Sequence, residues 1–304
     1  MKPSLLRFFR CPDCLGRLSL RVSSRLGNEI EDGSLACKRC GKSFIISSFI
    51  PRFVSSDQYT RSFSFQWNLF SSTQLNRAES EKTFIEKTGV RPKELRGKLV
   101  LEAGCGMGRF IDVISRYPQT TVIGFDLSLA VDAAYWNVGR RKNVHIIQAD
   151  IMKPPFPKGM SDFIFSIGVL HHTSDPEVAF SKLVPLLKKR GQVAIWVYLK
   201  QRGPILSDFY RIITSRMPWS WVLGLSKVLA KTYVVTKRFG YLRRILPVSM
   251  LPDSRQRLLD TFDWYSPRYQ FKFTADEVNS WFRKMGLRDV KLQSIPVAVS
   301  GKMR

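Results

Sequence analysis

Five short apolar runs, each followed by a stretch with helical spacing, constrain the fold of this chain more than any other feature. They read KLVLEA, TTVIGFD, VHIIQAD, SDFIFSIGV and GQVAIWVY and fall between residues 98 and 198. Strands that are apolar on both faces and alternate with helices are typical of parallel sheets covered by helices on both sides. The sequence therefore predicts an α/β fold built on such a sheet.

Helix signals extend this pattern toward the end of the chain. We expect one helix from Asp175 to about Lys188. After a long interruption, Thr274 and Glu277 have the spacing of a capping box, and Gly286 is placed to end the helix that they begin. Two further strand-like runs, LRDVKLQSI and PVAVSG, follow this helix. They would add an antiparallel strand to the edge of the parallel sheet.

The first strand runs directly into the glycine-rich loop EAGCGMGRF. A dinucleotide-binding loop needs a small residue where Arg109 stands, and a P-loop needs a Lys-Ser/Thr pair that is missing here. The loop instead has an acid, Glu102, two residues before its first glycine. An acid beside exposed backbone N–H groups suits a zwitterionic amino-acid tail better than a pyrophosphate.

Two more acids stand at the ends of the next two strands. Asp126 ends the second strand, where a carboxylate can accept both hydroxyl groups of a ribose. Asp150 ends the third strand, where it can meet the edge of an adenine. In an open α/β sheet these strand ends form the ligand crevice.

With these motifs the chain resembles the class I S-adenosylmethionine-dependent methyltransferases, in particular the broad type-11-like group with a D/E-x-G-C-G-x-G first motif. The resemblance covers about residues 97–200 closely and 266–304 more loosely, and it implies a seven-stranded Rossmann-like sheet. Glu102, with Gly104 and Gly106, would hold the methionine part of the cofactor, Asp126 the ribose, and Asp150 the adenine. The full predicted cofactor site is Glu102, Gly104, Gly106, Gly108, Asp126, Leu127, Asp150, Ile151 and Ile167.

Methyl transfer from a sulfonium needs mainly alignment and exclusion of water, and it needs a base only when the acceptor carries a proton of high pKa. His171 and His172 follow the fourth strand, at the ligand-binding edge of the sheet. Tyr265 belongs to an aromatic cluster that precedes the last helix. These three are our candidate catalytic residues, and a structural role stays open for each. The third histidine, His145, begins a strand and is expected to be structural.

The first 55 residues predict a small domain of their own. Cys11, Cys14, Cys37 and Cys40 form two C-x-x-C pairs separated by 22 residues. Two such turns can close a tetrahedral Cys₄ site with no open position, which is the form of a structural zinc site. The segment between the pairs alternates like a hairpin around Gly27 and Asn28. So small a unit would depend on its metal for most of its folding free energy.

Two other segments are open to more than one interpretation. Residues 56–96 are aromatic-rich and form either a cap over the ligand or an interdomain linker. Residues 200–265 predict a helical insertion after the fifth strand, with apolar residues at helical spacing and many Lys and Arg. The insertion is a lid, a basic amphipathic surface for anionic membrane or RNA, or a helical unit packed on the core with a solvated basic face.

Missing motifs narrow the choice of acceptor. Enzymes that methylate exocyclic base amines or glutamine amides carry Asn/Asp-Pro-Pro-aromatic after the fourth strand, where this chain reads IGVLHH. Methylation of cytosine C5 needs a nucleophilic cysteine, and the one cysteine outside the two pairs, Cys105, lies in the glycine loop. Both reactions are disfavoured.

Three functions fit the sequence. The chain has 49 Lys and Arg against 24 Asp and Glu, a formal net charge of +25 that attracts nucleic acid, anionic lipid or an acidic substrate. Our preferred function is methyl transfer to an O, N or C atom of a small or lipid-like metabolite. The alternative is an RNA methyltransferase, because a cysteine-rich domain ahead of a methyltransferase domain resembles the ribosomal-RNA guanine-N1 enzymes in domain order. A non-catalytic scaffold is the third and least favoured function, because the intact cofactor motifs argue against it.

Composition also bears on location. No run of 18 apolar residues exists, and the four paired cysteines suit a metal site in a reducing compartment better than disulfides. We expect a cytoplasmic protein, with peripheral contact to an anionic membrane as an open alternative. The oligomeric state is not predicted.

Overall fold

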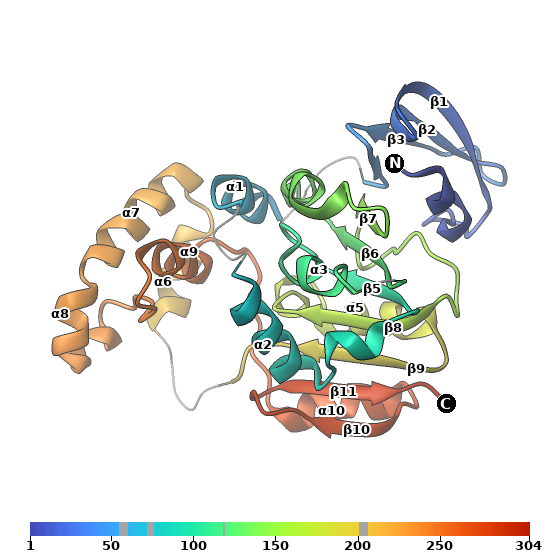
Figure 1. The fold of residues 1–304 in the computed structure, drawn as a ribbon. Coiled ribbons are helices and arrows are strands. Elements are labelled where there is room, and N and C mark those ends of the chain that lie inside the picture. The colour runs from blue at the N-terminus through green and yellow to red at the C-terminus, as the bar shows by residue number, and fades with distance from the viewer. Residues whose placement is uncertain (55–59, 72–75, 118, 201–205) are drawn as a thin grey trace.

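A computed structural model describes residues 1–54, 60–71, 76–117, 119–200 and 206–304. Its described strands form a single sheet of eleven, in the order β1-β2-β3-β4-β7-β6-β5-β8-β9-β11-β10 (Figure 1). The strands are β1 (Leu18–Leu26), β2 (Glu29–Cys37), β3 (Ser43–Ser47), β4 (Ile50–Arg52), β5 (Leu99–Ala103), β6 (Thr121–Asp126), β7 (Val144–Gln148), β8 (Ser161–Ile167), β9 (Leu187–Trp196), β10 (Arg288–Leu292) and β11 (Ala298–Lys302).

Seven of these strands form the predicted α/β core. Strands β7, β6, β5, β8 and β9 are parallel, and β11 joins β9 in the antiparallel direction, as expected from the two final strand-like runs. The count of eleven exceeds the predicted seven because the four N-terminal strands continue the same sheet.

Helices cover both faces of the core, since side chains alternate along each strand. In β5, Leu101 packs with helices α5 (Pro176–Leu183) and α10 (Ala275–Lys284) on one face. Val100 packs with α2 (Arg77–Thr88), α3 (Arg109–Ile114) and α4 (Ala130–Ala134) on the other. This period of two is what an apolar strand covered on both sides requires.

The helix predictions were right at one site and wrong at another. Helix α10 has the predicted capping box, in which Thr274 and Glu277 bond reciprocally to each other's backbone N–H. Helix α5 ends at Leu183 rather than near Lys188. Pro185 cannot continue an α-helix, and β9 has already begun at Leu187.

The N-terminal ribbon is built onto the sheet edge. The predicted hairpin is present as β1 and β2, joined at Gly27. Strand β4 pairs with β7 at Arg52 and Gln148, and the Phe53 N–H donates to the Gln148 carbonyl at 2.8 Å. Phe9, Phe53 and Phe156 pack in the core that also contains Ile123 and Phe125 of β6. The ribbon therefore shares a core with the sheet.

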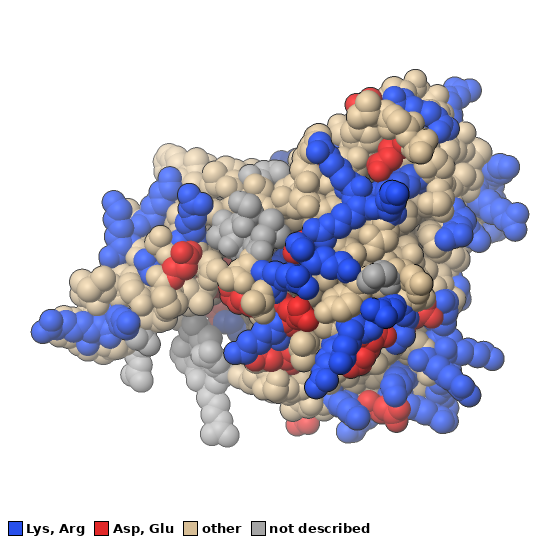
Figure 2. Space-filling model, viewed as in Figure 1, with Lys and Arg blue, Asp and Glu red and all other residues tan. Residues whose placement is uncertain are grey.

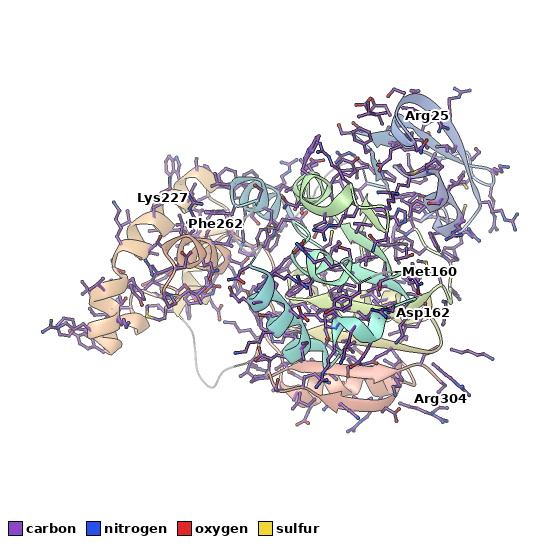
Figure 3. The ribbon with its side chains drawn as sticks, viewed as in Figure 1. Arg25, Met160, Asp162, Lys227, Phe262 and Arg304 are labelled. Carbon is purple, nitrogen blue, oxygen red and sulfur yellow. The ribbon has the colours of Figure 1, made fainter. Side chains whose placement is uncertain are left out.

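Five more α-helices complete the described chain. Helix α1 (Arg61–Leu69) lies in the segment expected to be a linker or cap, and α6 (Leu206–Thr214), α7 (Trp219–Lys231), α8 (Tyr233–Arg238) and α9 (Ser254–Tyr265) lie in the insertion. Helices α6 to α9 project beside the sheet (Figure 1). Phe262, labelled in Figure 3, is buried in the small core where α7 meets α9. Within the described residues, no helix combines the length and apolar character needed to cross a bilayer.

Candidate active site and cysteine cluster

A cavity of about 290 Å³ lies at the carboxyl ends of the parallel strands. Its floor comes from the segments that follow β5, β6, β7 and β8, and its cover from α1, α2 and α9. Eight of the nine predicted cofactor residues line it: Glu102, Gly104, Gly106, Asp126, Leu127, Asp150, Ile151 and Ile167. Gly108 does not. With a φ of 90° it is the left-handed N-cap of α3 and packs on Val138.

The glycine loop lies flat against β6. The N–H groups of Gly104 and Cys105 both donate to the Phe125 carbonyl, at 2.8 and 3.1 Å. The Gly106 N–H donates to Asp126 Oδ2 at 2.9 Å. These three N–H groups are therefore engaged within the protein and are not offered to a ligand.

Gly104 is required by a close approach. It has a φ of 81°, and a Cβ there would meet the Val169 side chain at 2.3 Å. Any other residue would be strained by the backbone conformation and would push Val169 aside.

Glu102 is the buried acid that faces this cavity. It is only 3% exposed, and its Oε2 atom has no hydrogen-bond partner among the residues that the structure describes. Burial, and secondly the charge of Asp126, raise the pKa of Glu102 well above its usual range. A buried carboxyl oxygen without a donor is costly unless a ligand supplies one. An ammonium group, such as that of an amino-acid tail, fits this position.

Asp126 and Asp150 differ in how firmly they are held. Asp126 accepts the Gly106 N–H on Oδ2 and both the N–H and the hydroxyl of Ser128 on Oδ1, at 2.8 and 2.7 Å. Burial nevertheless raises the pKa of Asp126. Asp150 Oδ1 accepts the Met152 N–H at 2.9 Å, and burial raises the pKa of Asp150 as well. Both carboxyls are fixed in orientation at the cavity wall.

The three candidate catalytic residues have different surroundings. His172 lines the cavity, and its Nδ1 lies 2.8 Å from the Tyr269 carbonyl. Burial lowers its pKa to about 4, so the ring is neutral at pH 7. His171 is fully buried behind it and stacks on Tyr198 with centroids 3.9 Å apart. Tyr265 lies outside the cavity, and its hydroxyl donates to the Pro247 carbonyl at 2.7 Å.

The cavity also has a second half, and none of the residues that line it is among our predicted site residues. Its aromatic rings are those of Phe63, Trp67, Trp196 and Tyr198. Three charged side chains, Lys87, Asp260 and Asp263, come to it from distant segments. Because α1 and α2 supply Phe63, Trp67 and Lys87, the segment expected to be a linker or cap has the position of a cap.

The titratable groups of this half have shifted pKa values. Burial raises the pKa of Asp260 and that of Asp263 to about 6. Tyr198 donates its hydroxyl to Asp263 Oδ2 at 2.9 Å. Burial lowers the pKa of Lys87 to about 7, and its Nζ lies 3.3 Å from the centre of the Trp196 ring. Groups that titrate near neutral pH inside a cavity are candidates for proton transfer.

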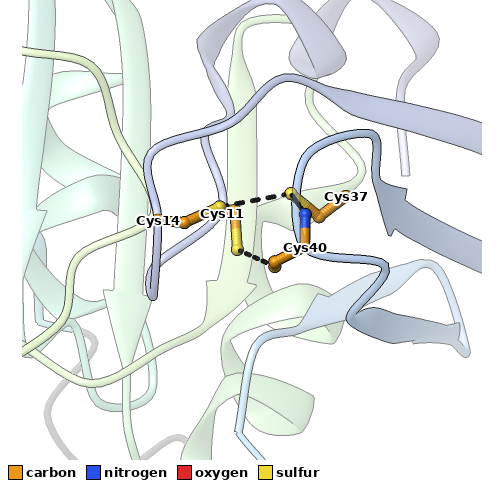
Figure 4. Close-up of side chains that lie close together, drawn as sticks. All are labelled: Cys11, Cys14, Cys37 and Cys40. Carbon is orange, nitrogen blue, oxygen red and sulfur yellow. Dashed lines mark hydrogen bonds between the residues drawn. The ribbon is translucent and has the colours of Figure 1, made fainter.

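The four paired cysteines converge from two turns (Figure 4). All four Sγ atoms lie within 4.8 Å of one another, with Cys11 and Cys40 at 3.7 Å and Cys14 and Cys37 at 3.4 Å. Tetrahedral zinc with Zn–S bonds of about 2.3 Å separates its sulfurs by about 3.8 Å. The Cys40 N–H, and secondly the Arg39 N–H, donate to Cys37 Sγ and lower the pKa of Cys37 to about 6. The donor set fits a Cys₄ zinc site.

Two family models match the chain. Residues 101–195 match the methyltransferase domain family, and residues 2–47 match the Trm112p-like protein family. The chain has a class I methyltransferase domain behind an N-terminal cysteine ribbon. The fold predicted from the strand-end motifs is thereby confirmed.

Curated relatives of this methyltransferase domain act on different acceptors. Phosphoethanolamine N-methyltransferase 1 of Zea mays is 31% identical over 46% of this chain and 27% of its own length. Malonyl-[acyl-carrier protein] O-methyltransferase of Legionella pneumophila is 32% identical over 30% of this chain and 33% of its own. tRNA U34 carboxymethyltransferase of Campylobacter fetus is 27% identical over 40% of this chain and 44% of its own length. The chain thus spans between about a quarter and under half of the length of these relatives.

Solved structures align over more of the chain but at lower similarity. Phosphoethanolamine N-methyltransferase 2 of Haemonchus contortus aligns with 79% of this chain and 47% of its own at a TM-score of 0.49 and 18% identity. This likeness is too distant to bear on the acceptor.

We predict that Asp126→Ala weakens binding of S-adenosylhomocysteine by about 1–3 kcal/mol, because charge-assisted hydrogen bonds are lost. Calorimetry measures the loss. Asp276→Asn, which removes an exposed acid on α10, is the control and should bind as the wild type does. Unchanged affinity in a folded Asp126→Ala protein would refute the assignment of this carboxylate to the cofactor.

We also predict about one zinc per chain by elemental analysis. Cys37→Ser should release the metal and lower the melting temperature, because a closed site stabilises the fold without taking part in chemistry. Binding of S-adenosylhomocysteine should persist in this variant. A metal-free protein with an ordered ribbon, as seen by amide exchange of residues 11–40, would contradict the assignment.

Proposed function

We propose that the protein transfers a methyl group from S-adenosylmethionine to a small or lipid-like metabolite. The observation that carries this proposal is the charge of the cavity. Five of the 24 acids of the chain line it (Glu102, Asp126, Asp150, Asp260 and Asp263), but only two of the 49 Lys and Arg (Lys87 and Arg109). An acidic cavity inside a protein of charge +25 suits a cationic cofactor and an uncharged or cationic acceptor.

The cofactor half would be held by the strand-end acids. Glu102 would accept the ammonium of the methionine part, Asp126 the ribose hydroxyls, and Asp150 the adenine edge, with Leu127, Ile151 and Ile167 as apolar contacts. S-adenosylmethionine supplies a methyl group that its sulfonium charge has already activated. The protein has to align the acceptor with that methyl group and exclude water.

The acceptor half would be the part lined by aromatic rings. Asp263 is our candidate base, because its carboxylate faces the cavity and is oriented by the Tyr198 hydroxyl. With a pKa of about 6 it is mostly ionised at pH 7 and still a useful proton acceptor. It would take the proton that an attacking N or O atom releases. Neutral His172 would position the acceptor rather than carry charge.

An RNA acceptor is the second candidate, favoured by the net charge and by the tRNA-modifying relative. A backbone of phosphates would have to approach five carboxyl groups, two of which have a pKa of about 6. That repulsion disfavours deep entry of an RNA strand, although a single uncharged base extruded from RNA would still fit.

Labelled cofactor distinguishes these candidates directly. Purified protein is incubated with cell extract and methyl-labelled S-adenosylmethionine, and the product is then divided by ribonuclease digestion and by organic extraction. We expect label in small molecules or in the organic phase. Label that is released only by ribonuclease would establish the RNA candidate. The absence of label from every fraction would favour the third function, a non-catalytic scaffold.

For the base we predict that Asp263→Asn lowers the turnover number by about 10²-fold to 10⁴-fold, while affinity for S-adenosylhomocysteine is retained. The wild-type rate should rise with pH through about 6 as Asp263 loses its proton, and this limb should be missing in the variant.

Stability provides the control for that variant. A carboxyl whose pKa is about 4 in the unfolded chain and about 6 in the folded protein lowers the free energy of unfolding progressively between about pH 4 and pH 6, and the full loss persists above pH 6. Asp263→Asn should therefore raise the melting temperature at pH 8 while it lowers turnover. Lower stability together with lower turnover would mean that Asp263 is structural.

A further inference from the structure

Helices α6, α7 and α8 leave an unusual amount of apolar surface exposed. Residues 206–245 contain 12 of the 23 large exposed hydrophobic side chains of the described chain. They are Phe209, Tyr210, Ile212, Ile213, Trp221, Leu225, Val228, Val234, Val235, Phe239, Tyr241 and Ile245. Scattered single exposed hydrophobic residues are normal, but contiguous ones on neighbouring turns mark a contact surface.

This surface is distinct from the face that each helix buries. In α7, Val222, Ser226 and Leu229 are buried against α9, whereas Trp221 is 67% exposed and Val228 is 63% exposed on other sides of the helix. In α6, Thr214 is buried and donates its hydroxyl to the Tyr265 carbonyl, while the neighbouring Ile213 is 67% exposed. The core of the insertion is thus complete without the exposed residues.

The same segment is strongly basic. Residues 206–245 contain eight Lys and Arg and one acid, Asp208. Asp208 is already paired with Arg211 and Lys272. The remaining exposed cations with described side chains include Lys227, Lys231 and Lys237. Figure 2 shows Lys and Arg side chains gathered around the projecting helices, and Figure 3 labels Lys227 on α7.

We propose that the exposed face of α6, α7 and α8 docks on an anionic lipid bilayer. Apolar side chains together with lysines on short helices are the composition of surfaces that insert shallowly into the headgroup region. Trp221 and Tyr241, at 67% and 66% exposed, are of the residue types enriched at that depth.

Charge decides against the other occupants. A second copy of this face would bring two strongly basic surfaces together. RNA would satisfy the lysines, but it offers no apolar environment to side chains such as Ile213, Val228 and Val234, which are 63–70% exposed on the same segment. An anionic bilayer satisfies both kinds of side chain at once.

The docking surface is joined to the cavity through one helix. Helix α9 presents Leu259, Asp260 and Asp263 to the cavity, and it presents Phe262 and Tyr265 to the core shared with α7. Bilayer contact would therefore place the acceptor half of the cavity near the lipid. Docking itself does not rest on the proposed function; only the conclusion that the acceptor is lipid-like does.

The test is sedimentation of the full chain with vesicles of phosphatidylcholine alone or mixed with phosphatidylglycerol. We expect binding to the mixed vesicles that falls with added salt. The triple variant Lys227→Gln, Lys231→Gln, Lys237→Gln should weaken it by on the order of 10-fold to 100-fold, since each cation near an anionic surface contributes about fivefold. The triple variant Ile213→Ser, Trp221→Ser, Val228→Ser should weaken it at least tenfold and also reduce binding at high salt.

Matched controls remove similar residues elsewhere. Leu26→Ser with Leu292→Ser removes side chains that are 67% and 53% exposed, and Lys158→Gln with Lys189→Gln removes two exposed cations distant from α6 to α8. Both controls should bind mixed vesicles as the wild type does, and circular dichroism should show all variants folded.

Four results would overturn the proposal. They are equal binding to both vesicle types, loss of binding in the control variants, tighter binding to RNA than to mixed vesicles, and self-association that disappears in the apolar variant. Binding of S-adenosylhomocysteine, measured on the same variants, should be unchanged. Loss of vesicle binding with cofactor binding intact separates a failure of docking from a failure of the proposed function.

Discussion

The hydrogen bonds that tie the glycine loop to β6 determine the geometry of the cofactor half of the cavity. Because the N–H groups of Gly104 and Cys105 share the Phe125 carbonyl, and that of Gly106 bonds to Asp126, the loop cannot rise from the sheet. The backbone then lies close enough to Val169 that no side chain fits at position 104. The same closeness buries Glu102 beside Asp126, and burial is the main reason that the pKa values of both acids are raised. One set of backbone contacts thus sets both the shape and the electrostatics of the cofactor half.

The half of the site that could be predicted is the half that topology brings together. Parallel strands deliver their carboxyl ends to one edge, so an acid at the end of each strand can be assigned from local sequence alone, and Asp126 and Asp150 both line the cavity. Lys87 and Asp263 could not be assigned in that way, because they arrive on helices from outside the strand–helix repeat. Tyr265 illustrates the difficulty: it is two residues from Asp263, but two residues turn an α-helix by about 200° and place it on the opposite face. Only the packing of α9 decides which of the two faces the cavity.

The acidic cavity is in tension with the stability of the fold. Buried carboxyl groups such as Asp260 and Asp263 destabilise the folded state once they ionise, and Glu102 Oε2 has no hydrogen-bond donor among the described residues. The rest of the molecule has to offset this. One contribution is the continuity of the eleven-stranded sheet, in which Phe9 and Phe53 of the ribbon pack with Phe156 in a core that also contains Phe125 of β6. The cysteine ribbon then supports the strand that ends in Asp126, although its own metal site has no open position for chemistry.

Helix α9 connects the cavity to the insertion. Its period of 3.6 residues sends Asp260 and Asp263 toward the cavity and Phe262 and Tyr265 toward the insertion. The Tyr265 carbonyl accepts the Thr214 hydroxyl of α6, and Val222 of α7 packs in the same small core as Phe262 and Tyr265, so both helices pack directly on α9. A contact made by the outer faces of α6 and α7 would therefore affect the positions of Asp260 and Asp263, the two carboxyl groups that line the acceptor half. A contact that fixes the insertion would therefore also fix the position of the candidate base, Asp263. The reason is that Asp263 and the residues that pack against the insertion lie on opposite faces of the same helix, α9.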